Sequence, residues 1–138
     1  NVPMRIRGYH GNESQWNDDL EKAIQKMGSY RVILDSSIVN LFDNYLNECK
    51  QNNISIILVY TPEYIEGQKF VSNRSEIMDM YNKISKKYEI PFYDYSEDTI
   101  SYMRQYFYNS GHMNKRGAEL FTAKLIDELK QNRQSLGF

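Results

Sequence analysis

The run Ile54–Tyr60, which reads ISIILVY, constrains the fold more than any other segment of the chain. A continuous stretch of β-branched and other apolar residues, closed by Thr61-Pro62, is typical of a strand that is buried on both faces of a sheet. Parallel sheets contain such strands, because helices cover both of their faces. The run therefore predicts a central strand in a layered α/β fold.

A helix is predicted directly before this strand. Asp35-Ser36-Ser37 supplies a sequence that can cap its first turn, and Asn52-Asn53 ends it. Between these boundaries, apolar side chains recur with the 3.6-residue period of one helix face: Ile38, Leu41, Phe42, Tyr45, Leu46 and Cys49. The periodicity predicts a single apolar stripe that packs against the rest of the protein.

The remaining sequence continues the alternation of helical segments and short apolar runs. We expect further helices over Asp18–Met27, over about Arg74–Tyr88, in part of Ser96–Phe107 with Ser96 as the N-cap, and from Asn114 to about Lys130. We expect short strands at Ile90–Asp94 and at Arg31–Leu34. Helices between short apolar strands predict parallel βαβ crossovers.

The predicted fold class is therefore α/β, with a three-layer, mostly parallel and flavodoxin-like sheet in one domain over residues 1–138. Residues 1–16, interrupted by Pro3, Gly8 and Gly11, are expected to form an arm or loop. Only two or three strands are recognisable, fewer than a doubly wound sheet uses. The alternative is an incomplete sheet that forms the C-terminal part of a larger domain.

Composition excludes several classes of partner. The net charge of -1 and the absence of a Lys/Arg cluster argue against binding to nucleic acid or to an anionic membrane surface. Cys49 is the only cysteine, so no disulfide can form within the chain. With one cysteine and only two histidines in the sequence, a metal site is not expected. No apolar run is long enough to insert into a membrane, and no cofactor is predicted.

His112 is the strongest candidate for a catalytic residue. It follows Ser110-Gly111 and lies just ahead of an amphipathic helix whose buried positions are expected to be Ala118, Phe121, Leu125 and Leu129. A neutral imidazole at such a turn can transfer a proton near neutral pH. The alternative for a single histidine in a loop is a solvated side chain without a function.

The residues around His112 carry a family resemblance. The stretch from Asn109 to Ala118 contains His112, Asn114 and Gly117. It resembles the last conserved block of the SGNH (GDSL-like) hydrolase superfamily. That block reads Asp-x-x-His, followed by Leu-Asn and a small residue where the final helix begins. The resemblance extends over about residues 37–130 and includes the Ile-Leu-Val strand before Thr-Pro-Glu.

The resemblance implies that His112 is a general base and that Asn109 occupies the position of the orienting aspartate. An amide can accept a hydrogen bond from the ring, but it cannot supply negative charge to an imidazolium. Asp94, Glu97 or Asp98 could replace the missing carboxylate in space. The family further implies acyl transfer to or from carbohydrate or cell-envelope esters, without a metal, in an extracytoplasmic or cell-envelope location.

The nucleophile is the main gap. The superfamily serine follows Gly-Asp at the end of the first strand, and the only similar residues here are Ser36 and Ser37, which follow Leu34-Asp35. The glycine is missing and no Gly-x-Asn-Asp block intervenes before His112. The favoured interpretation of Asp35 and Ser36 is therefore a helix N-cap.

Three hypotheses follow. The chain, which starts at Asn1 rather than Met, could be the C-terminal part of a serine esterase or O-acyltransferase, inactive without an N-terminal half that carries the serine. It could instead be a degenerate α/β domain that binds a ligand or assembles with a partner. A receiver-like module is disfavoured, because Asp35 and Asp94 are not arranged as its acidic cluster requires. An incomplete sheet would leave an exposed edge, which predicts a homodimer or pairing with a partner.

Overall fold

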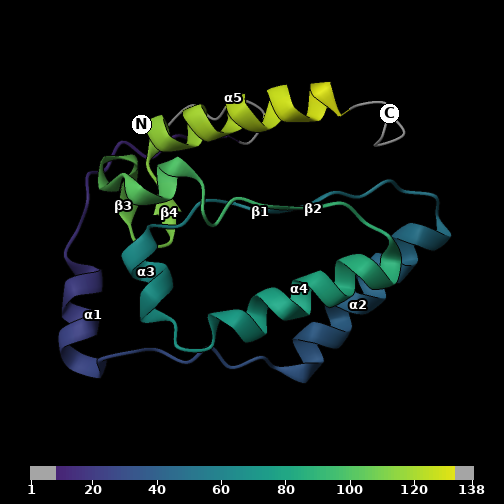
Figure 1. Cartoon of the computed structure of the whole chain (residues 1–138), viewed down its shortest axis with the longest axis horizontal. Helices are drawn as coiled ribbons and strands as arrows, with labels where there is room; N and C mark the ends of the chain where they lie inside the picture. Colours follow the sequence, from purple (N-terminus) through teal and green to yellow (C-terminus); the bar gives the residue numbers. More distant parts are fainter. Residues whose placement is uncertain (1–8, 133–138) are drawn as a thin grey trace.

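The computed structural model describes residues 9–132 and is a mixed α/β structure in which helices dominate (Figure 1). The helices are α1 (Asp19–Met27), α2 (Ser36–Gln51), α3 (Ile65–Phe70), α4 (Arg74–Tyr88) and α5 (Lys115–Gln131), with short 3-10 turns at Thr99–Tyr102 and Arg104–Tyr106. The strands are β1 (Leu58–Tyr60), β2 (Phe92–Asp94), β3 (Phe107–Asn109) and β4 (His112–Met113). The predicted helices are thus present, with boundaries close to those expected.

β1 and β2 form a parallel pair in which Leu58 lies opposite Phe92 and Tyr60 opposite Asp94. α3 and α4 connect the two strands, so the predicted βαβ crossover is confirmed. The prediction of a long strand buried on both faces was wrong. Only the last three residues of Ile54–Tyr60 are strand, and Ile54 is 56% exposed. Within residues 9–132 no other strand pairs with β1 or β2, so nothing extends the ladder along the run.

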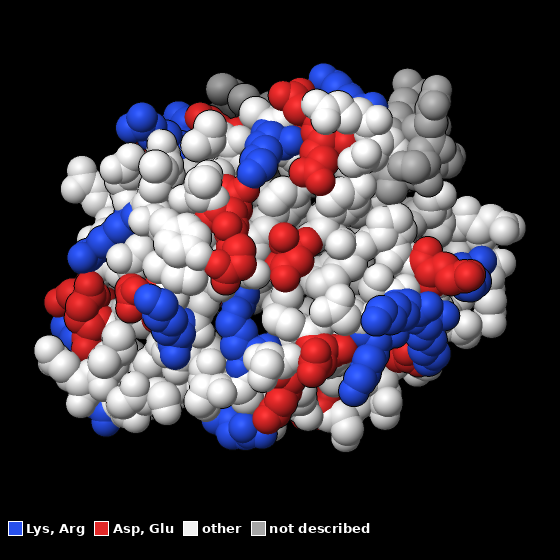
Figure 2. Space-filling model, viewed as in Figure 1, with Lys and Arg blue, Asp and Glu red and all other residues white. Residues whose placement is uncertain are grey.

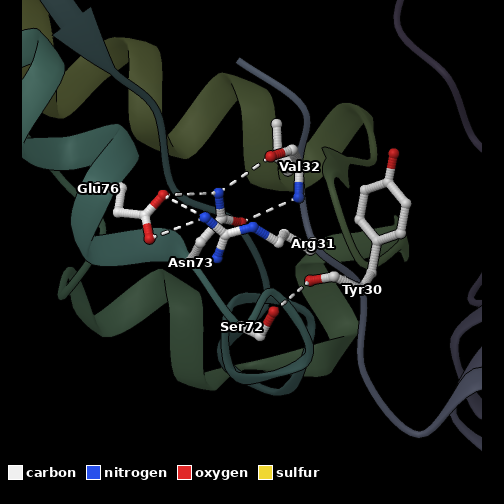
Figure 3. A network of polar contacts seen from close by, with 6 residues as sticks. All are labelled: Tyr30, Arg31, Val32, Ser72, Asn73 and Glu76. Atoms are coloured by element: carbon white, nitrogen blue, oxygen red, sulfur yellow. Dashed lines mark hydrogen bonds and ion pairs between the residues drawn. The ribbon is translucent and has the colours of Figure 1, made fainter.

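The expected strand at Arg31–Leu34 is also absent, although the segment is firmly held. Tyr30 forms a single parallel bridge with Val71, and the ladder stops there. At the next step the Asn73 side chain replaces a neighbouring strand: its amide oxygen accepts from the Val32 N–H (2.9 Å) and its amide nitrogen donates to the Val32 carbonyl (3.0 Å) (Figure 3). Arg31 also forms an ion pair with Glu76, in which Nη2 donates to both carboxylate oxygens.

Two apolar clusters hold the described residues together. The first consists of Tyr95, Ile100, Phe107 and Phe121, with Trp16, Tyr64 and Met113 among the side chains packed around it. The second consists of Leu46, Ile84 and Tyr88 and lies where α2 packs against α4. Figure 1 shows α5 on one side of the β1–β2 pair and α2 with α4 on the other. The two clusters therefore lie in different parts of the molecule.

Only part of the predicted apolar stripe of α2 is buried. Leu46 and Cys49 are buried, but Ile38, Leu41 and Tyr45 are exposed by 62%, 65% and 58%. The reason is geometric: α4 covers one flank of the stripe, and no described element covers the other.

The region before α5 departs most from expectation. Ser96 caps no helix, and Asp98 instead accepts from the Ile100 N–H (2.9 Å) at the start of the first 3-10 turn. Residues 107–113 form a small hairpin that sequence patterns did not indicate. Residues 10–16 form neither helix nor strand, as predicted, while the first eight residues of the expected arm lie outside the described range.

Candidate functional site

The candidate site is built on the hairpin of β3 and β4, which pair antiparallel with Asn109 opposite His112. Phe107 at the base of the hairpin is 1% exposed and belongs to the first apolar cluster, together with Phe121 of α5. On the other strand, Asn114 caps α5 by accepting from the Gly117 N–H (3.0 Å). One strand of the hairpin is thus held by the buried Phe107 and the other leads into the capped helix α5. These two attachments fix where His112 lies.

A close backbone contact also holds the hairpin against α5. A Cβ atom on Gly117 would lie 2.3 Å from the Tyr106 carbonyl oxygen, so no larger residue fits there without movement. The tip is tied to α3 by a hydrogen bond from the Tyr64 N–H to the Ser110 carbonyl (2.9 Å). Glycine at positions 117 and 67 permits these approaches, because a Cβ on Gly67 would lie 2.6 Å from Ser110 Cβ.

Asn109 and His112 are in direct contact. The amide Oδ1 of Asn109 lies 2.9 Å from His112 Nδ1, and it also accepts from the Gly111 N–H at 3.1 Å. A backbone N–H can only donate, so this second bond requires the oxygen of the amide to face the turn. The same oxygen then requires a proton on His112 Nδ1, which leaves the Nε2 lone pair free. The turn therefore favours the tautomer that a general base needs.

The imidazole of His112 is exposed. The ring stacks on Tyr108, with centroids 5.6 Å apart and planes inclined by 21°. Among residues 9–132, no hydroxyl, carboxylate or backbone group hydrogen-bonds to Nε2. None of five surface cavities formed by the described residues is lined by His112 or Asn109. The oriented imidazole thus faces solvent.

Ser36 and Ser37 lie far from this hairpin. They begin α2, a helix that lies apart from β3 and β4 (Figure 1). Asp35 is the N-cap, and its Oδ1 accepts from the Ser37 N–H (2.8 Å) and hydroxyl (2.6 Å). These bonds, the Ser37 hydroxyl first, hold the pKa of Asp35 below its usual value. The capping interpretation is confirmed, and neither serine is brought to His112.

The three carboxylates considered as substitutes for the missing aspartate have other partners. Asp94 accepts from the Ser96 N–H (2.9 Å), and Glu97 binds the Tyr102 hydroxyl. Asp98 has a buried side chain and pairs with Lys124. Burial alone would raise the pKa of Asp98, but the hydrogen bonds from Lys124 and the Ile100 N–H outweigh it and lower the pKa. Asn109 is the partner that orients His112.

A polar cluster that sequence reasoning missed lies at the carboxyl end of β1. The Tyr60 hydroxyl donates to Glu63 (2.8 Å), and the Arg74 guanidinium contacts both (3.0 and 3.1 Å). Burial, and then the Glu63 carboxylate, raises the pKa of Tyr60 to about 12. The Gln68 amide joins the loops after β1 and β2 by donating to the Glu63 and Ser96 carbonyls (both 2.8 Å). The only available signal was position, since α/β sites gather at these strand ends.

The structure gives no sign of a metal centre or membrane segment in the part that it describes. No group of three or more His, Cys, Asp and Glu side chains between residues 9 and 132 could hold an ion. No helix in that range is both long and apolar enough to cross a bilayer. Figure 2 shows basic and acidic side chains interspersed on the viewed face, without a block of one sign.

Comparisons with protein-family models, characterised proteins and solved structures gave no match.

Proposed function

We propose that this chain is the C-terminal part of an SGNH-type serine esterase or O-acyltransferase that acts on acyl esters of carbohydrate or cell-envelope polymers. The observation that carries the proposal is the Asn109–His112 contact of 2.9 Å, with the amide oxygen also bound by the Gly111 N–H. This arrangement presents a lone pair on Nε2 at an exposed turn, which is where a general base would meet a hydroxyl.

In the proposed reaction, His112 Nε2 removes the proton of a hydroxyl as its oxygen attacks the ester carbonyl, and later returns the proton to the leaving group. Asn109 is a positioning residue that keeps Nδ1 protonated. Because its amide is neutral, it stabilises the imidazolium less than aspartate would. In this proposal the hydroxyl comes from outside residues 9–132, since no hydroxyl in that range hydrogen-bonds to His112.

The proposal includes a three-layer, flavodoxin-like arrangement for the complete domain. The parallel pair of β1 and β2, with α5 on one side and α2 and α4 on the other, supports it (Figure 1). In such folds, sites form at the carboxyl ends of the strands. Tyr60 and Asp94 end the two strands, and the hairpin with His112 follows β2 in the chain.

A non-catalytic binding or assembly domain is the second candidate. The same exposed ring, without a hydroxyl partner or a lining cavity among the described residues, favours it. In that case the Asn109 bond would serve only to stabilise the turn, and substitution of His112 would leave ligand binding by the domain unchanged.

Hydrolysis of p-nitrophenyl acetate tests the proposal. The 138-residue chain should show no burst of acyl-enzyme, whereas a longer product of the same gene should show one that is lost in His112→Ala. His10→Ala is the matched control, because His10 is the other histidine of the chain and is exposed. Asn109→Asp should raise the turnover of the longer protein. A longer protein that is equally active with and without His112 would refute the proposal.

A further inference from the structure

Asn109 has a neighbour in the sequence that no other asparagine of the chain has. It alone among the asparagines of the 138 residues is followed by a glycine, an alanine or a serine, namely Ser110. Asparagine is a thermolabile residue. It loses its amide group in water most readily before a small residue, because the next backbone nitrogen is then unshielded and can attack the side-chain carbonyl carbon. The sequence thus singles out Asn109 for this reaction.

The turn at residues 109–112 holds the Asn109 side chain in a suitable position for the attack. Its Oδ1 accepts from the Gly111 N–H (3.1 Å), which folds the side chain back over the Ser110 peptide, as in an Asx turn. None of the hydrogen bonds among residues 9–132 uses the Ser110 N–H, and Asn109 Nδ2 donates to no group in that range. The attacking nitrogen and the leaving group are therefore both available.

Two donors converge on the oxygen that becomes negative during the attack. The Gly111 nitrogen and His112 Nδ1 lie 3.1 and 2.9 Å from Asn109 Oδ1. Donors that are already in place at a developing oxyanion lower the barrier of acyl chemistry. The turn is also open to water, since Gly111 and His112 are exposed and a Cβ on Gly111 would meet nothing within 4 Å.

We propose that Asn109 is a deamidation site in the folded protein and that its reaction places a carboxylate beside His112. The Ser110 nitrogen forms a bond to Asn109 Cγ, the bond from Cγ to Nδ2 breaks, and Nδ2 leaves as ammonia with the proton of the Ser110 N–H. Water then opens the resulting succinimide. Cleavage of the bond between Cγ and the ring nitrogen gives aspartate, and cleavage on the side of the backbone carbonyl gives isoaspartate.

The aspartate product carries the carboxylate that the proposed general base lacks. It can accept the proton of His112 Nδ1 as the amide oxygen does, and it adds the negative charge that stabilises an imidazolium. The change runs in one direction, because the ammonia is lost to the solvent. This consequence for catalysis rests on the proposed function, whereas the deamidation itself does not.

Peptide mapping by mass spectrometry tests the site after the whole folded chain has been incubated at mildly alkaline pH. Aspartate and isoaspartate should accumulate first at Asn109. Asn53 is the matched internal control, because it is exposed in the turn after α2 but is followed by the β-branched Ile54. Asn73 should stay intact, since it is 2% exposed and both of its amide atoms are bonded to Val32. An Asn109 that is still intact when Asn53 has reacted would overturn the proposal.

Two variants test the route of the reaction. Ser110→Pro removes the attacking N–H and should abolish deamidation at Asn109. His112→Ala removes one of the two donors and should slow the reaction several-fold, less than in an enclosed active site, because the turn is exposed. His10→Ala is the matched control and should react like the native chain. A native rate in either Ser110→Pro or His112→Ala would overturn the proposal, because the amide would then be lost without the contacts of the turn.

Turnover of p-nitrophenyl acetate by the longer product of the gene separates this inference from the proposed function. Asn109→Asp is the standard for complete conversion to aspartate. The aged native protein should gain turnover in step with its content of aspartate at position 109, and Ser110→Pro should not. No gain in Asn109→Asp would refute the proposed function, whereas a gain in Asn109→Asp without deamidation of the aged native protein would refute this inference alone.

Discussion

The two apolar clusters differ in how completely the chain covers them. Around Phe107 and Phe121, α5, the hairpin and aromatic side chains such as Trp16 close the cluster from several directions. Around Leu46, α4 closes one flank of α2 and leaves Ile38 and Leu41 exposed on the other. The first cluster is thus enclosed by described elements on several sides, whereas the described residues leave one side of α2 uncovered beside the second.

Truncation of one large side chain in each region should separate them most clearly. Phe107→Ala should lower the free energy of unfolding by about 3–5 kcal/mol, because it opens a cavity at a side chain that is 1% exposed. Leu41→Ala should change it by less than about 0.5 kcal/mol in the monomer, since that side chain makes few contacts to lose. Urea denaturation at low protein concentration measures both, and equal losses would remove the contrast.

The close contact under the hairpin gives the next largest effect. Gly117→Ala should cost about 1–3 kcal/mol, because its Cβ would meet the Tyr106 backbone, which cannot move without displacing the hairpin. Gly111→Ala is the matched control at the hairpin tip, where a Cβ would meet nothing within 4 Å, and it should be nearly neutral. A neutral Gly117→Ala would mean that the hairpin is held less tightly than the geometry indicates.

Acid should lower the stability of the folded protein through Asp98, which pairs with Lys124 of α5. Its pKa is lowered in the folded state, so its contribution to stability is full above the unfolded value of about 4 and is lost as the pH falls through the folded value. Asp98→Asn keeps the cap but removes the charge that faces Lys124, and should cost about 1 kcal/mol at neutral pH.

The pH dependence provides the control for this carboxylate. As the pH falls below about 4 and through the lower folded pKa of Asp98, the difference between Asp98→Asn and the native chain should shrink, because the native carboxyl then becomes protonated as well. Asp127→Asn, on the exposed side of α5, should behave like the native chain across the range. A constant difference between Asp98→Asn and native protein at all pH values would show that charge is not the cause.

Apart from α3, which lies in the segment Glu63–Ser72 that we expected to be a loop, the helices were predictable from sequence because their signals are local. The cap at Asp35, the period of Ile38–Cys49 and the Asn114 cap each lie within one segment. Periodicity identifies which side of a helix is apolar, but it does not say whether another element covers that side. The whole stripe of α2 was therefore expected to be buried, and half of it is not.

The strands and the site geometry depended on contacts that the sequence does not display. The run Ile54–Tyr60 has strong strand character, yet its pairing depends on neighbours, and β2 offers only three residues. Asn73 ends the bridge at Tyr30 with its side chain, an event that no pattern of residues predicts. By contrast, the resemblance to the SGNH block implied that Asn109 takes the position of the orienting aspartate, and its side chain does contact His112, since residues three apart can meet across a tight turn.

The tautomer of His112 tests the central claim about the site most directly. Nitrogen-15 NMR of the histidine ring, at a pH where it is neutral, should report a protonated Nδ1 and an unprotonated Nε2, because the amide oxygen of Asn109 accepts from Nδ1. Asn109→Ala should shift the ring to a mixture of both tautomers. A native ring with its proton on Nε2 would contradict the account, since the nitrogen that faces solvent could then not act as a base.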